Sequence, residues 1–400
     1  AGEGLLFLYL AYKYVKPGGV IAFVLPRNVL SGVSWFLARA LLASKFHVKY
    51  VIVSNDTEDG YNFSEGTSLS EALIVARRVD NHEPSEETRF VILMKKPRTA
   101  IDAVVLADRL LGGNVPYDEA RVITVSRTGL LKNLDNWGLF IAFNDVSLIE
   151  DVISVTKGEV CGIKVPIALF NDIMKTIGID RHEFRDIFER VRSETPYPIL
   201  YGGGEEVRTK MLIEPNAYAR PKDEKRAKDK FSEFSSSILL PDRVRVNTAH
   251  VIAIYSERPI LSNIFYAVKL RCNNADKALV VWLNTTWGLI TILANREETE
   301  GAFAELKMSQ WRLLPILNVC ALDDDALRRL SGVFDRYANK EFKRITEQYG
   351  EETDLTRLSF DLDFLRALSP GIDENSARQC LTDLYRRLGI ALRTWIGKDD

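Results

Sequence analysis

The chain has 400 residues, of which 46% are hydrophobic and 27% charged, so it is long enough for two or three globular domains. Its 53 Lys and Arg against 55 Asp and Glu exclude a chain-wide basic surface, and a nucleic-acid contact would need a local basic cluster. No apolar run reaches the roughly 18 to 20 residues that span a bilayer, and no signal-peptide pattern is present, so we expect no membrane association. The sequence opens without Met, directly in a predicted helix, which suggests a fragment or a processed chain.

The cysteines are few and far apart in sequence. Cys161, Cys272, Cys320 and Cys380 form no Cys-x-x-Cys pair, and the four histidines are equally scattered. This spacing predicts no metal site, and it favours free thiols in a reducing cytoplasm.

The first hundred residues alternate between helical and strand patterns. Residues 4–15 are apolar almost all round, which predicts a buried helix. A continuous apolar run at 20–25 predicts a strand covered on both faces, as in parallel sheets. The remaining expected elements are a helix at 33–45 and strands at 48–54, 71–78 and 89–96. Together they predict an α/β class chain whose first domain, residues 1–105, is the second half of a doubly wound, Rossmann-like sheet.

The pattern changes after a Pro/Gly-rich boundary at residues 97–118. We expect an α+β domain over residues 106–320, followed by a helical tail over residues 321–400. Within these ranges the sequence predicts a helix at 181–193, a Pro/Gly-rich loop at 195–208, an exposed charged segment at 219–230, strands between 238 and 270, and a buried helix at 276–294.

Short catalytic motifs give little information in this chain. It contains no Gly-x-Gly-x-x-Gly and no Gly-x-Ser-x-Gly, and the glycines at 202–204 are not followed by the Gly-Lys-Ser/Thr of a phosphate-binding loop. The acidic run Asp323–Asp325 is read as a helix start. The informative feature is instead an ordered series of segments.

That series begins with VKPGGVIAFVLP at residues 15–26 and continues with NFSEGTSLSEALIVAR at residues 62–77. In this order, the segments resemble the N6-adenine DNA methyltransferases of restriction-modification systems, the class that includes TaqI-like enzymes and type I modification subunits. The segments LLPDRVRVNT, LSNIFYAV, ALVVWLNTTWGL and REETEGAFAELK, between residues 239 and 307, and then LPIL at residues 314–317, are similar to the target-recognition region of that family.

The resemblance implies a role for Phe63. An enzyme that modifies a base inside a duplex must flip the base out, and a flat apolar side chain can then hold it. Phe63 matches the family's aromatic residue that stacks on the flipped adenine, and Tyr61 is the competing choice. The alternative is that Phe63 only packs under its own loop.

One departure from the family is serious. The catalytic motif, Asp/Asn/Ser-Pro-Pro-Tyr/Phe, and the glycine-rich loop that binds S-adenosylmethionine do not occur in the sequence. In the family, the first of these motifs positions the adenine amino nitrogen for methyl transfer. The resemblance therefore implies that methyl transfer from S-adenosylmethionine relies on residues upstream of this chain or on a separate chain.

The recognition region offers candidate DNA contacts. Arg243 and Arg245 alternate on a predicted strand, so both face one side, and Asn247 continues that side. Arg can donate twice to guanine and Asn can pair with adenine, whereas the alternative is a solvated strand face with ion pairs. Asn284 interrupts a buried helix, which indicates either a capping role or a DNA-facing end.

Two further candidates lie in a polar segment that begins at Asn295. Arg296 and Lys307 are suited to phosphate contact, and the alternative is a structural salt-bridge loop. The expected function is thus DNA target recognition by the C-terminal part of a site-specific adenine-N6 methyltransferase, with double-stranded DNA as the partner and a restriction or specificity subunit as a further one. Two alternatives stay open: a non-catalytic recognition or scaffolding subunit, and an unrelated α/β protein that does not bind DNA.

Overall fold

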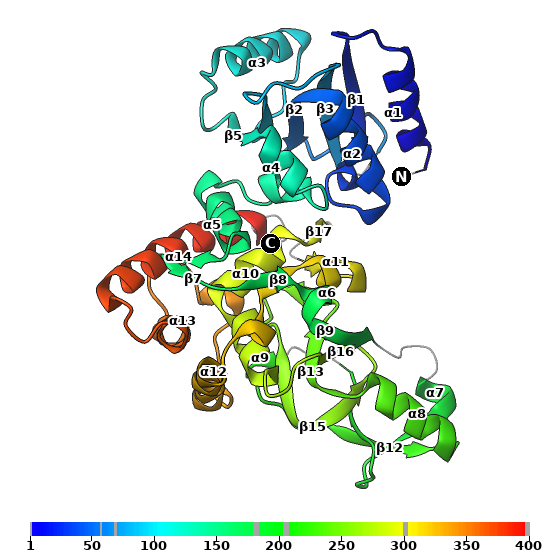
Figure 1. Ribbon diagram of the computed structural model, residues 1–400, viewed down its shortest axis with the longest axis vertical. Coiled ribbons are helices and arrows are strands. Elements are labelled where there is room, and N and C mark those ends of the chain that lie inside the picture. The colour runs from blue at the N-terminus through cyan, green and yellow to red at the C-terminus, as the bar shows by residue number, and fades with distance from the viewer. Residues whose placement is uncertain are drawn as a thin grey trace. The chain divides into compact units, whose positions relative to one another are not determined.

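The computed structural model describes residues 2–56, 58–67, 70–178, 184–202, 208–298 and 303–396. The chain divides into two compact units, residues 1–150 and 151–400 (Figure 1). The first boundary therefore falls later than the expected 105/106, and the helical end of the chain belongs to the second unit. The physical reason is that β5 (Ala120–Ser126) joins the first sheet by pairing with β4 (Glu87–Leu93).

Unit 1 alternates helix and strand, as predicted. Its other elements are α1 (Gly2–Tyr14), β1 (Val20–Pro26), η1 (Arg27–Val29), η2 (Val33–Trp35), α2 (Phe36–Lys45), β2 (Phe46–Ser54), β3 (Glu71–Arg78), α3 (Ala100–Gly112), α4 (Arg127–Lys132) and η3 (Trp137–Ile141). Helix α5 (Val146–Thr156) crosses the boundary between the units.

The sheet of unit 1 has the order β1-β3-β2-β4-β5. Strands β2 and β4 are parallel, and β3 lies antiparallel between β1 and β2, so β1, β2 and β4 run in the same direction. The α/β class is confirmed, but the sheet is mixed rather than a purely parallel doubly wound one. A continuous apolar run indicates that both faces of a strand are apolar, and it carries no information on strand direction.

The two faces of β1 are covered to different extents, which corrects the expectation of a strand covered on both faces. Ile21 and Leu25 are buried on one face, whereas Val20 and Val24 on the other are 55% and 41% exposed. Helix α1 likewise buries Leu8 and leaves most of its other large apolar residues exposed, namely Leu6, Phe7, Tyr9, Leu10 and Tyr14. The expected helix is confirmed, but only one of its sides is buried.

Unit 2 contains many short strands and a helical end. Its elements are β6 (Glu159–Val160), β7 (Ile163–Lys164), β8 (Ile167–Leu169), α6 (Phe170–Ile173), β9 (Met174–Gly178), α7 (Phe184–Ile187), β10 (Phe188–Val191), β11 (Pro198–Leu200), β12 (Ala217–Pro221), α8 (Glu224–Phe234), β13 (Ser236–Pro241), β14 (Arg243–Arg245), β15 (Ile254–Ser262), β16 (Phe265–Leu270), α9 (Asp276–Asn284), α10 (Thr286–Ala294), β17 (Glu297–Glu298), β18 (Phe303–Glu305), α11 (Met308–Leu313), β19 (Pro315–Leu317), η5 (Val319–Ala321), α12 (Asp324–Tyr337), η6 (Ile345–Glu347), α13 (Leu355–Leu368) and α14 (Glu374–Ile396).

A seven-stranded sheet, ordered β10-β12-β11-β15-β13-β16-β9, forms one layer of unit 2. The helix predicted at 181–193 is only partly present, because α7 ends at Ile187 and β10 pairs antiparallel with β12. Residues 179–183 lie outside the described part of the chain. Phe188 of β10 enters a core cluster with Ile199 and Leu261, so burial at the sheet outweighs the local helical pattern.

The buried helix expected at 276–294 is two helices, α9 and α10. Thr285 caps α10 by accepting a hydrogen bond from the N–H of Gly288 at 3.1 Å. Within the described residues, no single helix is long and apolar enough to cross a membrane, and α9 and α10 meet that requirement only as a pair bent by 72°.

A buried polar network fixes this helix break. Asp361 accepts a hydrogen bond from the N–H of Thr286 at 3.2 Å and one from the hydroxyl of Tyr385 at 2.6 Å. Arg357 donates to the carbonyl of Asn284 at 2.5 Å, and it lies 3.7 Å from Asp361. Asp361 and Arg357 are both buried, so each charge depends on its partners in the interior.

The cysteines are paired, which corrects the expectation of free thiols. Disulfides join Cys161 to Cys380 and Cys272 to Cys320, with Cα–Cα distances of 6.0 and 5.5 Å. Pairing requires that the Cα atoms approach within about 7 Å and that the side chains point toward each other, and the folded chain achieves this for residues 219 and 48 positions apart. Sequence spacing contains no information on that approach.

Candidate functional site

The first candidate site lies at one edge of the unit 1 sheet. Strands β1, β2 and β4 run in the same direction, so their carboxyl ends meet at this edge, and β3 begins there because Glu71 pairs with Pro26. Open α/β sheets bind ligands outside the carboxyl ends of their strands. The loop between β2 and β3, which carries Phe63, lies at that edge.

Asp56 organises the start of this loop. One carboxylate oxygen accepts the N–H groups of Glu58 and Asp59 at 2.8 and 3.1 Å, and the other accepts the N–H of Lys96 at 2.7 Å. Burial disfavours the charged carboxylate, but these three N–H groups and the Lys96 charge outweigh it and hold the pKa of Asp56 below its ordinary value. The loop is thereby attached to the segment that follows β4.

Glu71 organises the other end of the loop. Its Oε2 accepts the N–H groups of both Phe63 and Ser64 at 2.7 Å. The Lys96 ammonium donates to the carbonyl of Asn62 at 2.8 Å. The backbone on both sides of the Phe63 Cα is thus fixed by side chains from β3 and from the segment that follows β4.

The Phe63 ring is half-buried. It packs against a cluster of buried residues that includes Leu93 of β4 and Leu110 of α3. Tyr61 is also half-buried, and its carbonyl accepts the N–H of Glu71 at 3.1 Å. Packing of Phe63 under its own loop is therefore observed, and its stacking on a flipped base stays a prediction.

A polar chain lies beside this loop. Arg27, directly after β1, donates to the Oδ1 of Asn55 at 2.9 Å, and Asn55 donates to the Oδ1 of Asn144 at 2.6 Å. S-adenosylmethionine, which the resemblance implies, would need polar groups directed toward it at this edge. Because Asn55 and Asp56 bond to other parts of unit 1, these side chains do not by themselves fit a cofactor site.

The second candidate site is a three-stranded sheet in unit 2, ordered β14-β18-β17, which we call the β14 sheet. Arg243 and Arg245 both point to the exposed side of β14, and Val244 between them is buried. Their backbone partners on β18 are Glu305 and Phe303. The expected strand and the shared side of the two arginines are confirmed.

The same sheet brings together the candidates from the later segment. Arg296 immediately precedes β17, and exposed Lys307 follows β18 by two residues. Lys307 also precedes α11, where its N–H donates to the side chain of Gln310 at 2.5 Å. Residues 299–302, part of the expected polar loop, lie outside the described part of the chain.

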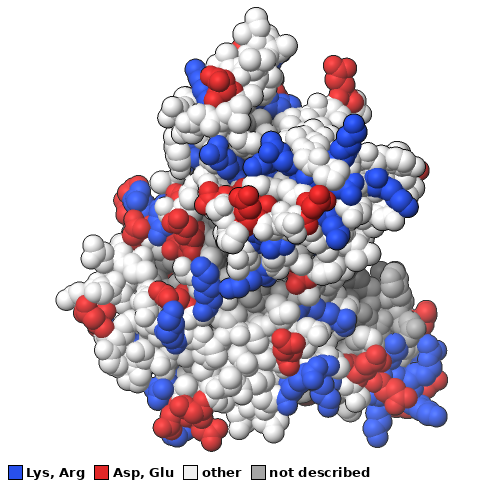
Figure 2. All heavy atoms as spheres, turned by 45° about the horizontal axis from the view of Figure 1, so that its top comes forward, with Lys and Arg blue, Asp and Glu red and all other residues white. Residues whose placement is uncertain are grey.

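Charge on the β14 sheet is not purely positive. Arg243 lies 3.5 Å from Glu305, and its side chain is 62% exposed. An ion pair this open to water contributes little to stability, so Arg243 can exchange Glu305 for another anion at small cost. Over the face in view, Figure 2 shows Lys and Arg interspersed with Asp and Glu, in keeping with the near-neutral composition.

Asn284 does not belong to this surface. Its side chain is 3% exposed, accepts the N–H of Ile252 at 2.7 Å, and donates to the carbonyls of Ala253 and Val280 at 2.8 and 2.9 Å. Of the two alternatives for Asn284, the structural one is observed, which corrects the expected DNA contact. Asn247 does not continue the strand side of Arg243 and Arg245, which corrects that expectation: β14 ends at Arg245, and the half-buried Asn247 lies in the turn that follows.

Sequence reasoning missed the anchoring residues Asp56, Glu71 and Lys96. The signal that could have found them is position, because each lies at or just beyond a strand end next to the Phe63 loop. Within the described ranges, no group of three or more His, Cys, Asp or Glu side chains could hold a metal ion.

No protein-family model and no curated protein matches the chain. Among solved structures, 99% of the chain aligns with the type IIG restriction endonuclease BpuSI at 12% identity and a TM-score of 0.43, covering 50% of BpuSI. The methyltransferase subunit of a type I restriction-modification system from Streptococcus thermophilus aligns with 34% of the chain at 19% identity (TM-score 0.27, 29% of that subunit). A chain of another type I restriction-modification complex aligns with 33% at 18% identity (TM-score 0.25, 30% of that chain). The chain thus spans about half the length of the first and under a third of the other two.

Proposed function

We propose that this chain recognises DNA as part of a site-specific adenine-N6 methyltransferase of a restriction-modification system. The observation that carries the proposal is the β14 sheet, in which Arg243 and Arg245 lie on β14, Arg296 immediately precedes β17 and Lys307 follows β18 by two residues. The ordered resemblance in sequence supports the same conclusion. Binding would occur in the cytoplasm, where the DNA is.

The β14 sheet suits a DNA backbone in its chemistry. Guanidinium groups of Arg243 and Arg245 on one side of a strand can contact phosphates or donate twice to a guanine edge. The Glu305 carboxylate next to Arg243 would be displaced by a phosphate on binding. Asn247, in the turn that follows β14, would offer an amide for an adenine.

Unit 1 would serve the reacting base. In the proposed function Phe63 stacks on an adenine flipped out of the duplex, and the anchors Glu71 and Asp56 hold its loop at the carboxyl ends of the strands. S-adenosylmethionine would supply the methyl group from a site formed by residues other than those described in this chain. The partners proposed are double-stranded DNA and a restriction or specificity subunit.

A second candidate function is a recognition or scaffolding subunit that works beside a separate catalytic chain. The observation in its favour is that Asn55 and Asp56, at the carboxyl ends of the unit 1 strands, bond within unit 1 and do not by themselves fit a cofactor site. Both functions predict DNA binding by the β14 sheet. They differ in whether methyl transfer appears when the catalytic motif is joined to this chain or only when it is supplied as a second polypeptide.

The test is fluorescence anisotropy of the chain with random-sequence duplex DNA at about 50 and 200 mM salt, the range in which phosphate contacts are weakened. We expect affinity to fall steeply with salt, and Arg243→Ala with Arg245→Ala to reduce the slope of log K against log salt by about 2. The matched control is Arg328→Ala with Arg386→Ala, which removes the same charge from exposed sites on α12 and α14.

Three outcomes are informative. An unchanged slope in the β14 variant together with a reduced slope in the control would indicate that the helical end, and not the β14 sheet, contacts DNA. An equal reduction in both would indicate a general charge effect. No binding by the parent at low salt would overturn DNA recognition by this chain alone.

A further inference from the structure

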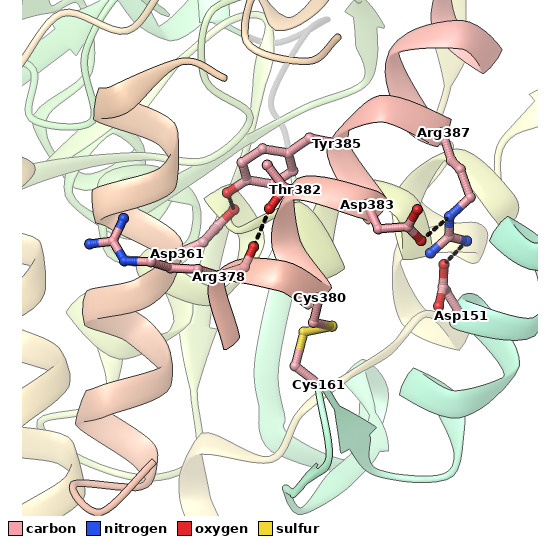
Figure 3. The surroundings of a disulfide bond; sticks show 9 residues. All are labelled: Asp151, Cys161, Asp361, Arg378, Cys380, Thr382, Asp383, Tyr385 and Arg387. Atoms are coloured by element: carbon pink, nitrogen blue, oxygen red, sulfur yellow. Dashed lines mark hydrogen bonds and ion pairs between the residues drawn. A yellow bond between two sulfur atoms is a disulfide. The ribbon is translucent and has the colours of Figure 1, made fainter. Parts of the chain in front are cut away.

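The last helix of the chain, α14, is attached to the beginning of unit 2 by two links. The Cys161–Cys380 disulfide joins it to the turn between β6 and β7. Arg387 lies 2.5 Å from Asp151 of α5, and its Nε also donates to Asp383 at 2.9 Å. Figure 3 shows Cys380 and Arg387 directed to the same side of α14, toward Cys161 and Asp151.

The two links share a side of the helix because Cys380 and Arg387 are seven residues, or about two turns, apart. Another side of α14 enters the interior, where Leu381, Leu384 and Leu388 are buried. Tyr385 on that side donates to Asp361, the carboxylate that also accepts the first N–H of α10. The position of α14 is therefore connected to the buried network at the α9–α10 break.

Cys161 occupies an unusual backbone conformation. It forms the turn between β6 and β7 together with Gly162, and their φ angles are +43° and +78°. A two-residue hairpin turn with positive φ at both positions favours Asn-Gly or Gly-Gly, because a larger side chain is strained there. A cysteine persists at such a position only while its surroundings hold it, and the bond to Cys380 supplies that constraint.

Burial does not distinguish the two disulfides, because Cys161, Cys380, Cys272 and Cys320 are all half-buried. The difference is the positive φ of Cys161, since a disulfide held under strain is more readily reduced than an unstrained one. The Cys161–Cys380 bond also closes a loop with a sequence separation of 219, against 48 for Cys272–Cys320. A longer closed loop constrains the unfolded chain more, so opening the first bond should cost more stability than opening the second.

We propose that Cys161–Cys380 is a thiol–disulfide exchange site at which a dithiol reductant releases the α14 attachment. A reductant thiolate attacks one sulfur of the Cys161–Cys380 bond, forms a mixed disulfide with it, and displaces the other as a thiolate. The second thiol of the reductant then attacks the mixed disulfide. The reductant ends as a disulfide, and Cys161 and Cys380 end as two thiols after gaining two electrons and two protons.

Release changes the two links unequally. The hairpin turn at Cys161 relaxes once the bond is gone, because its strained φ is no longer enforced. The Asp151–Arg387 ion pair and the buried leucines of α14 remain, so we expect the first turns of α14 and the hairpin to open while the rest of the helix stays packed. This inference concerns unit 2 alone and does not rest on the proposed function.

The first experiment follows both disulfides in the full chain along a graded series of reduced and oxidised glutathione and of dithiothreitol, with alkylation and mass spectrometry of the four cysteines. We expect Cys161–Cys380 to open at milder reduction than Cys272–Cys320. Hydrogen exchange should then rise in residues 159–164 and in the first turns of α14, and the melting temperature should fall by about 5 to 15 °C.

Variants separate the covalent link from the strained turn. Cys161→Ser with Cys380→Ser should reproduce the reduced protein, and the matched control, Cys272→Ser with Cys320→Ser, should leave exchange at residues 159–164 unchanged. Cys161→Gly with Cys380→Ser should be more stable than the double serine variant, because Gly accepts positive φ without strain.

Several results would overturn the inference. One is free thiols at Cys161 and Cys380 in air-purified protein. Another is opening of both disulfides together only when the whole unit unfolds. Equal stability of the glycine and serine variants would remove the strained turn from the explanation.

Discussion

The loop that carries Phe63 and the β14 sheet are held in place in opposite ways. Carboxylates fix the loop through its backbone, since Glu71 and Asp56 accept five N–H groups between them. The β14 sheet instead presents exposed side chains on a short strand, with Arg243 next to an exchangeable Glu305. The loop is thus organised before any ligand arrives, whereas the guanidinium groups can adjust to a partner. Substitutions should therefore affect structure in the first region and binding in the second.

The largest expected effect is that of Phe63→Ala. Loss of the ring should weaken binding to duplex DNA with a mismatched adenine by about 5- to 150-fold, because stacking contributes about 1 to 3 kcal/mol per base. It should also lower the stability of unit 1, since the ring packs on Leu93 and Leu110. Anisotropy with matched and mismatched duplexes measures the first effect, and urea unfolding measures the second.

Tyr61→Ala is the comparison for this variant, because Tyr61 is the competing aromatic residue in the loop. If Tyr61→Ala selectively weakens binding to the mismatched duplex and Phe63→Ala does not, the stacking role belongs to Tyr61. Loss of stability without any change in binding for Phe63→Ala would leave the ring a purely structural role.

A smaller effect is expected for Glu71→Ala. The N–H groups of Phe63 and Ser64 would lose their acceptor, and water can replace it at the exposed Ser64, so the free energy of unfolding of unit 1 should fall by about 0.5 to 1.5 kcal/mol. Hydrogen exchange should rise at the N–H groups of residues 62–66. Glu65→Ala, which removes an exposed carboxylate from the same loop, is the control and should change neither quantity. Unaltered exchange in Glu71→Ala would contradict the anchoring role.

The smallest effect is a pH dependence centred on Asp56. Its pKa is lower in the folded protein than in the unfolded chain, so the unfolded chain binds the proton more tightly. The stabilisation is therefore fully present above the ordinary aspartate pKa of about 3.9, and it is lost as the pH falls through the lower folded pKa. Unfolding of unit 1 measured from pH 6 to pH 2 should show this loss.

Asp56→Asn supplies the matched control for the pH dependence. Its amide does not titrate in this range, so the difference in stability between parent and variant should shrink as the pH falls. A constant difference across the range would show that the Asp56 charge contributes nothing to the loop.

Many helices and strands could be predicted from the local sequence pattern alone. The strand predicted at 71–78 is β3 in full, the run at 20–25 is β1, and Asp323 caps α12 by accepting the N–H of Ala326 at 2.7 Å. These features depend on contacts within a few residues, such as caps, and on side-chain alternation, which sequence spacing reports directly.

Some candidate site residues could likewise be placed from the local pattern, and others could not. The shared side of Arg243 and Arg245 follows from strand periodicity alone. The burial of Asn284 cannot be predicted from periodicity. A polar residue in an apolar helix needs hydrogen-bond partners elsewhere in the chain, and for Asn284 these are the backbones of Ile252 and Ala253. Sequence reasoning could leave two alternatives open, and only the fold chooses between them.

By itself, the sequence determined that this is an α/β chain with a later strand-rich region and a helical end, and it marked Phe63 and the arginines of β14. Only the tertiary structure decided the mixed strand directions, the boundary at residue 150, the anchoring of the Phe63 loop and the pairing of the four cysteines. The physical reason is distance along the chain. Periodicity and capping act over a few residues, whereas strand partners, buried hydrogen bonds and disulfides join positions tens to hundreds of residues apart, where one linear pattern is compatible with many arrangements.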